Sequence, residues 1–140
     1  MSRIPVELRQ LVYERALGHC EYCLIHEAYN AKRHEIDHII PVKHRGETVA
    51  DNLCLSCFHC NRYKGSNFSS FDPETGEPVP LFNPRLDRWA EYFCLDRGTG
   101  YPLSPIGRVT VHILRMNLPA RLEERALLIN LKRYPPDMEE

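Results

Sequence analysis

Residues 20–65 read CEYCLIHEAYNAKRHEIDHIIPVKHRGETVADNLCLSCFHCNRYKG, and this stretch decides the fold of the 140-residue chain. It opens with a first cysteine pair, Cys20 and Cys23, and a second cysteine pair, Cys57 and Cys60, lies near its end. The Cys-x-x-Cys spacing lets both thiolates of a pair bind one tetrahedral ion, with sulfur about 2.3 Å from zinc. The two pairs therefore predict a closed structural Zn²⁺ site that joins the beginning of the stretch to its end.

Three other interpretations of these cysteines stay open: disulfides, an iron site of the rubredoxin type, or unrelated buried thiols. Rubredoxin sites carry Pro and Gly around their cysteines, and CEYC and CFHC contain neither. Cys54 and Cys94 lie outside the spacing among apolar neighbours, so we expect them to be buried thiols. Zinc is the favoured interpretation, and it would contribute on the order of 10 kcal/mol to folding.

Between the two pairs, the local patterns predict a strand, a loop, a second strand and a helix. The first strand spans residues 34–40 and is stopped by Pro41, and the loop runs over residues 42–51 through a glycine. The second apolar run spans residues 53–55, and residues 57–64 form a short helix that Gly65 ends. The order is therefore that of a compact ββα unit.

The flanking segments are predicted to be mainly helical. Residues 5–17 show a helical period that ends at Gly18. In the C-terminal part, Asn83 and Pro84 predict a helix over residues 84–94 with Trp89, Tyr92 and Phe93 in the core. Ser104 and Pro105 predict another helix, although residues 109–111 (VTV) also suit a strand, and a last helix follows with Leu118, Leu122, Leu128 and Ile129.

These patterns together predict an α+β fold in one domain. Residues 1–65 hold the N-terminal helix and the zinc-framed unit, and residues 66–82 form a Ser-, Gly- and Pro-rich connecting loop. Residues 83–134 form a helical C-terminal extension packed on the same domain, and residues 135–140 are expected to be a disordered tail.

Composition favours a cytoplasmic protein without a membrane partner. No apolar run approaches the roughly 18 residues that a membrane span requires, and the opening MSRIPVELRQ carries charges where a secretory leader is apolar. The net charge of −1 argues mildly against a nucleic-acid-binding protein. Basic residues nevertheless gather near the motifs, among them Lys43, Arg45, Arg62 and Lys64.

Four further residues lie in the order of a known motif: Asp37, His38, Asn52 and Asn61. The segments HEIDHIIP (34–41), DNLCLSC (51–57) and CNRYKG (60–65) resemble the HNH endonucleases, whose ββα-metal or His-Me finger motif lies on two strands and a helix. The resemblance covers the cysteine pairs, the Asp-His pair, the central Asn and the final Cys-Asn-x-x-Lys. The third residue of the family's motif is usually His, whereas this chain has Asn61 there, as in a His-Asn-Asn variant.

The resemblance implies a role for each of these residues. His38 would be the general base, Asp37 and Asn61 would bind the catalytic metal ion, and Asn52 would hold the loop between the strands. His34, Glu35 and His59 lie near enough in the sequence to be alternative ligands. Since neighbours in a strand point to opposite faces, Asp37 and His38 can reach one phosphate only if the strand ends or bulges there.

The chemistry of phosphodiester hydrolysis requires residues of these types. A histidine can take the proton of the attacking water near neutral pH, and a carboxylate with an amide oxygen suits a hard ion such as Mg²⁺ or Mn²⁺. Lys43, Arg45, Arg62 and Lys64 would contact flanking phosphates of nucleic acid, expected to be double-stranded DNA. The predicted function is a metal-dependent DNA endonuclease, and the alternative is a non-catalytic zinc module that binds nucleic acid or protein.

Overall fold

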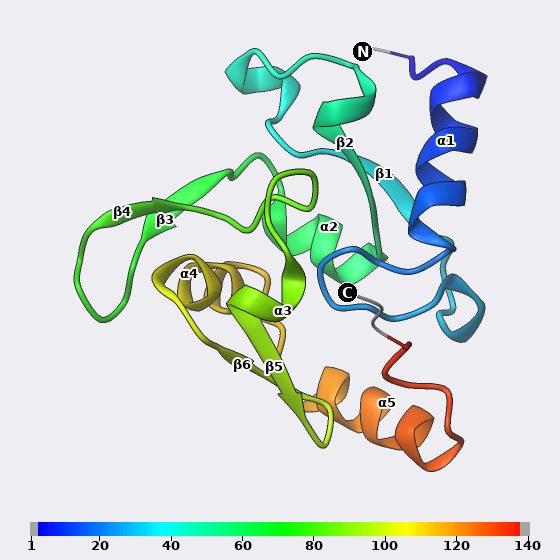
Figure 1. Ribbon diagram of the computed structural model, residues 1–140, viewed down its shortest axis with the longest axis vertical. Coiled ribbons are helices and arrows are strands. Elements are labelled where there is room, and N and C mark those ends of the chain that lie inside the picture. The colour runs from blue at the N-terminus through cyan, green and yellow to red at the C-terminus, as the bar shows by residue number, and fades with distance from the viewer. Residues whose placement is uncertain (1–2, 138–140) are drawn as a thin grey trace.

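The structure is a computed structural model that describes residues 3–137, and it combines helices with small antiparallel strand pairs (Figure 1). The α-helices are α1 Val6–Ala16, α2 Phe58–Lys64, α3 Trp89–Tyr92, α4 Pro105–Ile113 and α5 Pro119–Asn130. The strands are β1 Glu35–His38, β2 Leu53–Ser56, β3 Ser69–Phe71, β4 Pro78–Pro80, β5 Phe93–Asp96 and β6 Thr99–Pro102. Within residues 3–137, none of the helices has the length and apolar character needed to cross a membrane.

The predicted ββα unit is present. Strands β1 and β2 pair antiparallel with Asp37 opposite Cys54 and His38 opposite Leu53, and α2 follows β2 directly. β1 is shorter than the predicted strand over residues 34–40, and it ends at His38, three residues before Pro41. Asp37 and His38 both lie within the paired part of β1, so alternation along the strand places their side chains on opposite faces.

One face of the β1–β2 pair is covered by α1, as Figure 1 shows. Val12 of α1 and Leu53 and Leu55 of β2 form a small buried core, and Ile36 of β1 packs against it. The predicted helix over residues 5–17 is confirmed, and it ends where Leu17 takes a left-handed conformation with φ of 52°. This helix fixes the strand pair from the side opposite α2.

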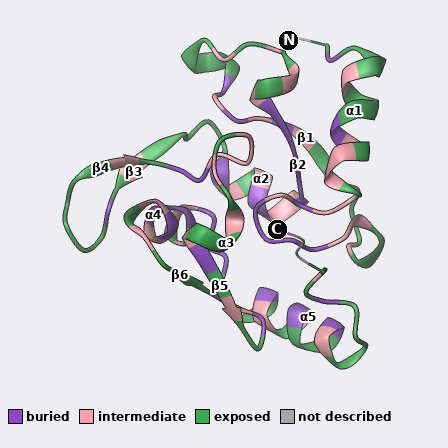
Figure 2. Ribbon diagram, viewed as in Figure 1, coloured by how far each residue is buried: buried purple, intermediate pink, exposed green. Residues whose placement is uncertain are grey.

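The opposite face joins a larger core that extends into the C-terminal extension (Figure 2). The four cysteines of the two pairs belong to it, together with apolar side chains from residues 82–134. Those side chains are Phe82, Phe93, Leu114, Met116, Leu128 and Tyr134. Residues before 65 and after 80 therefore share one continuous core.

Two predictions for the middle of the chain were wrong. The connecting segment 66–82 contains a strand pair, β3 with β4. The helix predicted over residues 84–94 is limited to the single turn of α3, because the Asn83 side chain accepts a hydrogen bond from the Arg85 backbone N–H at 2.8 Å and closes a turn instead. The chain then enters the β5–β6 hairpin, so the extension is less helical than expected.

The β5–β6 hairpin has a signal that the helical interpretation missed. Its two-residue loop is Arg97-Gly98, and both residues have positive φ, at 54° and 87°. Such a turn matches the twist of the flanking strands and requires a glycine or a similarly tolerant residue. Cys94, expected to be buried, is exposed because it alternates with buried Phe93 along β5.

The last two helices are confirmed. The Ser104 hydroxyl accepts a hydrogen bond from the Gly107 N–H at 3.0 Å and begins α4, so residues 109–111 are helical rather than extended. Of the tail predicted to be disordered, residues 138–140 lie outside the described part of the chain. Residues 135–137 have no helix or strand.

Candidate metal centre and active site

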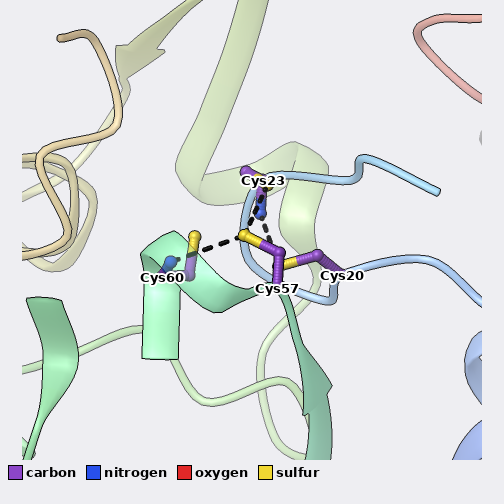
Figure 3. A group of neighbouring side chains, drawn as sticks. All are labelled: Cys20, Cys23, Cys57 and Cys60. Carbon is purple, nitrogen blue, oxygen red and sulfur yellow. Dashed lines mark hydrogen bonds between the residues drawn. The ribbon is translucent and has the colours of Figure 1, made fainter. Parts of the chain in front are cut away.

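The four cysteines of the two pairs meet at one point (Figure 3). The first pair lies in the loop after α1, and the second lies at the start of α2, where Cys57 is the N-cap. Their sulfur atoms all lie within 4.8 Å of one another, and all four side chains are buried. Among the described residues this is the one group of three or more His, Cys, Asp and Glu side chains that is arranged to hold a metal ion.

The geometry of these thiols fits zinc. In a tetrahedral site with sulfur at about 2.3 Å from the ion, neighbouring sulfurs lie about 3.8 Å apart. The Sγ atoms of Cys23 and Cys57 are 3.7 Å apart, which matches such an edge and is far too long for a disulfide. The disulfide interpretation is therefore wrong, and the centre is compatible with one zinc ion held by four thiolates.

A buried cation lies beside this centre. The Nη2 atom of Arg121, in α5, donates to Cys60 Sγ at 3.1 Å and lies 3.8 Å from Cys57 Sγ. Burial by itself lowers the pKa of the Arg121 guanidinium, but the charges of the neighbouring cysteines outweigh burial and raise that pKa above its ordinary value. Hydrogen bonds from the other three thiols hold the pKa of Cys23 well below its usual range.

The C-terminal extension also binds the backbone of the first cysteine pair. The Trp89 indole N–H donates to the Tyr22 carbonyl at 2.8 Å, and the Tyr134 hydroxyl donates to the Cys23 carbonyl at 2.7 Å. Arg85 forms an ion pair with Glu21. Phe93 is buried in the core, as the sequence predicted, and half-buried Trp89 and Tyr92 pack against it. Trp89 and Tyr134 hold the loop that carries Cys20 and Cys23.

Asp37, predicted to be a ligand of the catalytic ion, lies in β1 on the face toward α2. Its Oδ2 atom is 3.0 Å from the Lys64 Nζ and accepts a hydrogen bond from the Tyr22 hydroxyl at 3.2 Å. Burial raises the pKa of the Asp37 carboxyl, and the Lys64 ammonium opposes that rise. Lys64 also donates to the His38 carbonyl at 3.0 Å, so it fixes the end of β1.

Asn61, the second predicted ligand, lies in α2 and contacts a different carboxylate. Its Nδ2 atom donates to Glu35, which precedes Asp37 by two positions and shares its face of β1. Because the amide nitrogen faces Glu35, the Oδ1 atom of Asn61 is the one left for a cation. Asn61 and Lys64 thus contact Glu35 and Asp37 respectively, along one side of β1.

His38 ends β1, and its side chain is half-buried. Its Nε2 atom lies 2.9 Å from the Thr48 hydroxyl oxygen in the loop before β2. A hydroxyl that accepts the Nε2 proton leaves Nδ1 with the lone pair of the neutral ring. Thr48 is therefore placed to fix the orientation of the His38 ring.

Asn52 lies where it can hold the loop between the strands. Its Oδ1 atom accepts the Ile40 N–H at 2.8 Å, and its Nδ2 atom donates to the carbonyls of Ile40 at 3.0 Å and Glu47 at 2.9 Å. The loop is closely folded at Gly46, since a Cβ atom there would lie 1.6 Å from the Ile40 carbonyl oxygen. This packing leaves room only for glycine.

The sequence-predicted residues lie on one small unit, and each contacts a different partner. Within residues 3–137, no hydrogen bond or ion pair joins any two of Asp37, His38 and Asn61 directly. Oxygen atoms of Asp37, Glu35 and Asn61 share the β1–α2 side, and that donor set suits a hard divalent cation.

The predicted phosphate contacts need one correction. Lys43, Arg45 and Arg62 are exposed, with the Arg62 guanidinium over the Phe58 ring at 5.9 Å. Lys64 is only 1% exposed, because its ammonium is paired with Asp37 inside the fold. Lys64 is therefore a structural cation here and not a surface contact for nucleic acid.

Sequence reasoning missed the roles of Thr48 and Arg121 and ranked Glu35 below Asn61. Thr48 lies ten residues after His38 without a spacing that marks it, and Arg121 lies far from the motif. Glu35 carried a usable signal, because alternation along a strand places it on the same face as Asp37.

Comparison with protein families found a match for the segment that holds this geometry. Residues 20–67 match the HNH endonuclease family model. The resemblance drawn from the sequence is confirmed for residues 20–67, and this matched segment, called the HNH domain below, contains both cysteine pairs, β1, β2 and α2. The curated proteins and the solved structures contain no significant match to the chain.

The first prediction concerns the four-cysteine centre of the HNH domain. Replacing Cys57 with Ser removes one thiolate but keeps a favourable N-cap for α2, so we expect loss of bound zinc and of cooperative thermal unfolding. The expected loss is large, because zinc contributes on the order of 10 kcal/mol in small zinc modules. Elemental analysis and calorimetry measure the two effects.

Cys94→Ser is the matched control, because Cys94 is exposed and lies outside the centre. It is expected to keep the zinc content and melting temperature of the wild type. A Cys57→Ser protein that melts cooperatively at an unchanged temperature would contradict a structural metal at this centre.

Proposed function

We propose that this chain is a divalent-metal-dependent endonuclease that hydrolyses phosphodiester bonds of double-stranded DNA. The observation that carries the proposal is the position of Asp37, His38, Asn52 and Asn61 on the strand, loop and helix of one matched HNH domain. HNH nucleases act on nucleic acid. The proposal assigns Zn²⁺ to the four-cysteine centre and Mg²⁺ or Mn²⁺ to the β1–α2 side.

His38 is the proposed general base. With Thr48 accepting the Nε2 proton, the Nδ1 atom is free to take the proton of the attacking water. The contact also restrains the ring at the end of β1, and Asn52 keeps the neighbouring loop in place. Positioning of this kind lowers the entropic cost of bringing base, water and phosphate together.

Asp37 and Asn61 are the proposed ligands of the catalytic ion, and Glu35 is proposed to orient Asn61. When bound, such an ion neutralises charge that develops on the phosphate and on the leaving oxygen. Lys64 shares the Asp37 carboxylate and holds it against β1, so Asp37 is fixed before substrate arrives. Exposed Lys43, Arg45 and Arg62 are proposed to contact the flanking phosphates without reading the bases.

One observation favours the second candidate, a non-catalytic zinc module. The Oδ2 atom of Asp37 is already paired with Lys64 inside the fold, and Asp37 is only 7% exposed. A binding module with this architecture would keep the zinc centre and the surface cations without cutting DNA. Cleavage assays separate the two candidates.

The second prediction is that His38→Ala abolishes DNA cutting. Nicking of supercoiled plasmid with Mg²⁺ or Mn²⁺ is expected to fall by about 100-fold or more, the typical contribution of a general base. His112→Ala is the matched control, since His112 is exposed on α4 outside the HNH domain, and it is expected to cut at the wild-type rate. Equal cutting by wild type and His38→Ala would refute the assigned base.

The third prediction concerns the catalytic ion. Asn61→Ala removes the proposed amide ligand, so the metal concentration needed for half-maximal nicking is expected to rise at least several-fold. Arg62→Ala, one position further, removes a phosphate contact instead. It is expected to leave the metal requirement unchanged and to reduce the salt dependence of DNA binding by a slope of about one. A wild-type metal requirement in Asn61→Ala would exclude Asn61 as a ligand.

A further inference from the structure

The buried arginine beside the four-cysteine centre lacks the partner that a buried arginine ordinarily has. Arg121 is 5% exposed, and within residues 3–137 no carboxylate forms an ion pair with its guanidinium. A buried charge without a counter-charge is costly. The negative groups that its Nη2 atom faces are the sulfur atoms of Cys60 and Cys57, at 3.1 and 3.8 Å.

The four-cysteine centre, in turn, requires a nearby positive charge. Four thiolates around a divalent ion leave two negative charges in excess, and this centre is enclosed by the main core of the protein. In an interior of low polarity such a charge requires a nearby cation and N–H donors to sulfur. Backbone N–H groups of Cys23 and Cys60 face sulfurs at 3.5 and 3.4 Å, and they carry no net charge.

We infer that Arg121 is the built-in counter-ion of the zinc centre and that its charge determines how firmly the centre retains zinc. The inference rests on the zinc proposed for this centre and not on the nuclease activity. Arg121 lies in α5, well outside the matched HNH domain, so the C-terminal extension contributes a charge that the domain itself does not supply.

The remaining contacts of Arg121 explain why an arginine suits this position. Its Nη1 atom donates to the Leu114 carbonyl at 2.8 Å and to the Arg115 carbonyl at 3.3 Å, at the end of α4. The planar guanidinium can thus satisfy free carbonyls of one helix while it presents another N–H edge to sulfur. Arg121 therefore connects α4, α5 and the zinc centre through one side chain.

The same helix contains a matched control. Arg125 is equally buried, at 3% exposure, but it donates to the carbonyls of Gly98 and Met116, each at 2.6 Å. Removing Arg125 deletes a buried guanidinium and its backbone contacts without removing a charge next to sulfur. Any effect common to both positions reports packing, and an effect confined to Arg121 reports the zinc centre.

The test measures zinc release from the purified full chain to an excess of a chromophoric chelator. Arg121→Gln keeps an N–H donor and loses the charge. It is expected to release zinc about 10- to 100-fold faster than wild type, in proportion to the loss of metal affinity that removing a partner of a metal ligand usually causes. Arg121→Lys keeps the charge and is expected to restore most of the slow release. Arg125→Gln is expected to release zinc at the wild-type rate.

Similar release rates for Arg121→Gln and Arg125→Gln, or for Arg121→Gln and Arg121→Lys, would overturn the inference. If Arg121→Gln does not fold, the wild type itself provides the test after substitution with NMR-active cadmium. A scalar coupling between cadmium and a guanidinium proton of Arg121 is then expected, and its absence would overturn the inference. A wild-type chain that binds no zinc would refute the zinc centre as well, so the two failures are distinguishable.

Discussion

The gathering of four cysteine thiols from two distant segments is the constraint on which the rest of the structure depends. The first pair lies in the loop after α1, and the second pair begins α2, so one ion bound there would fix the position of the helix relative to the strand pair. Without that constraint, the four-residue strands β1 and β2 and the seven-residue helix α2 have few contacts of their own to define a unique packing. The C-terminal extension stabilises the same centre. Trp89 and Tyr134 contact the loop that carries the first pair, and Arg121 contacts a sulfur of the second pair.

The geometry of the proposed active site depends on the four-cysteine centre. α2 follows its N-cap Cys57, and it presents Asn61 to Glu35 one turn further and Lys64 to Asp37 two turns further. The position of Asn61 along β1 therefore follows from the position of the second cysteine pair. On the loop side, Asn52 and Gly46 pack the chain tightly, and Thr48 meets His38. The four-cysteine centre and the proposed catalytic residues are separate, but the centre positions the helix that carries Asn61 and Lys64.

Much of the HNH domain could be predicted from the sequence because its signals are local. Cys-x-x-Cys spacing, the Asp-His pair before Pro41 and the glycine after α2 each specify a short element. The secondary structure of the extension was harder to predict. Its β5–β6 hairpin depends on the Arg97-Gly98 turn, and the signal of that turn competed with a helical period around Trp89. Contacts between distant residues could not be predicted at all. The burial of Lys64 against Asp37 and the placement of Arg121 beside Cys60 arise only when separate elements pack together.

X-ray absorption at the zinc edge of the purified wild-type chain tests the account most directly, because it reports the atoms bound to the metal. The account predicts one zinc ion per chain with four sulfur neighbours at about 2.3 Å and no nitrogen or oxygen in the first shell. A chain without zinc, or zinc with histidine nitrogen or water among its bound atoms, would contradict a four-thiolate centre as the constraint that defines the fold.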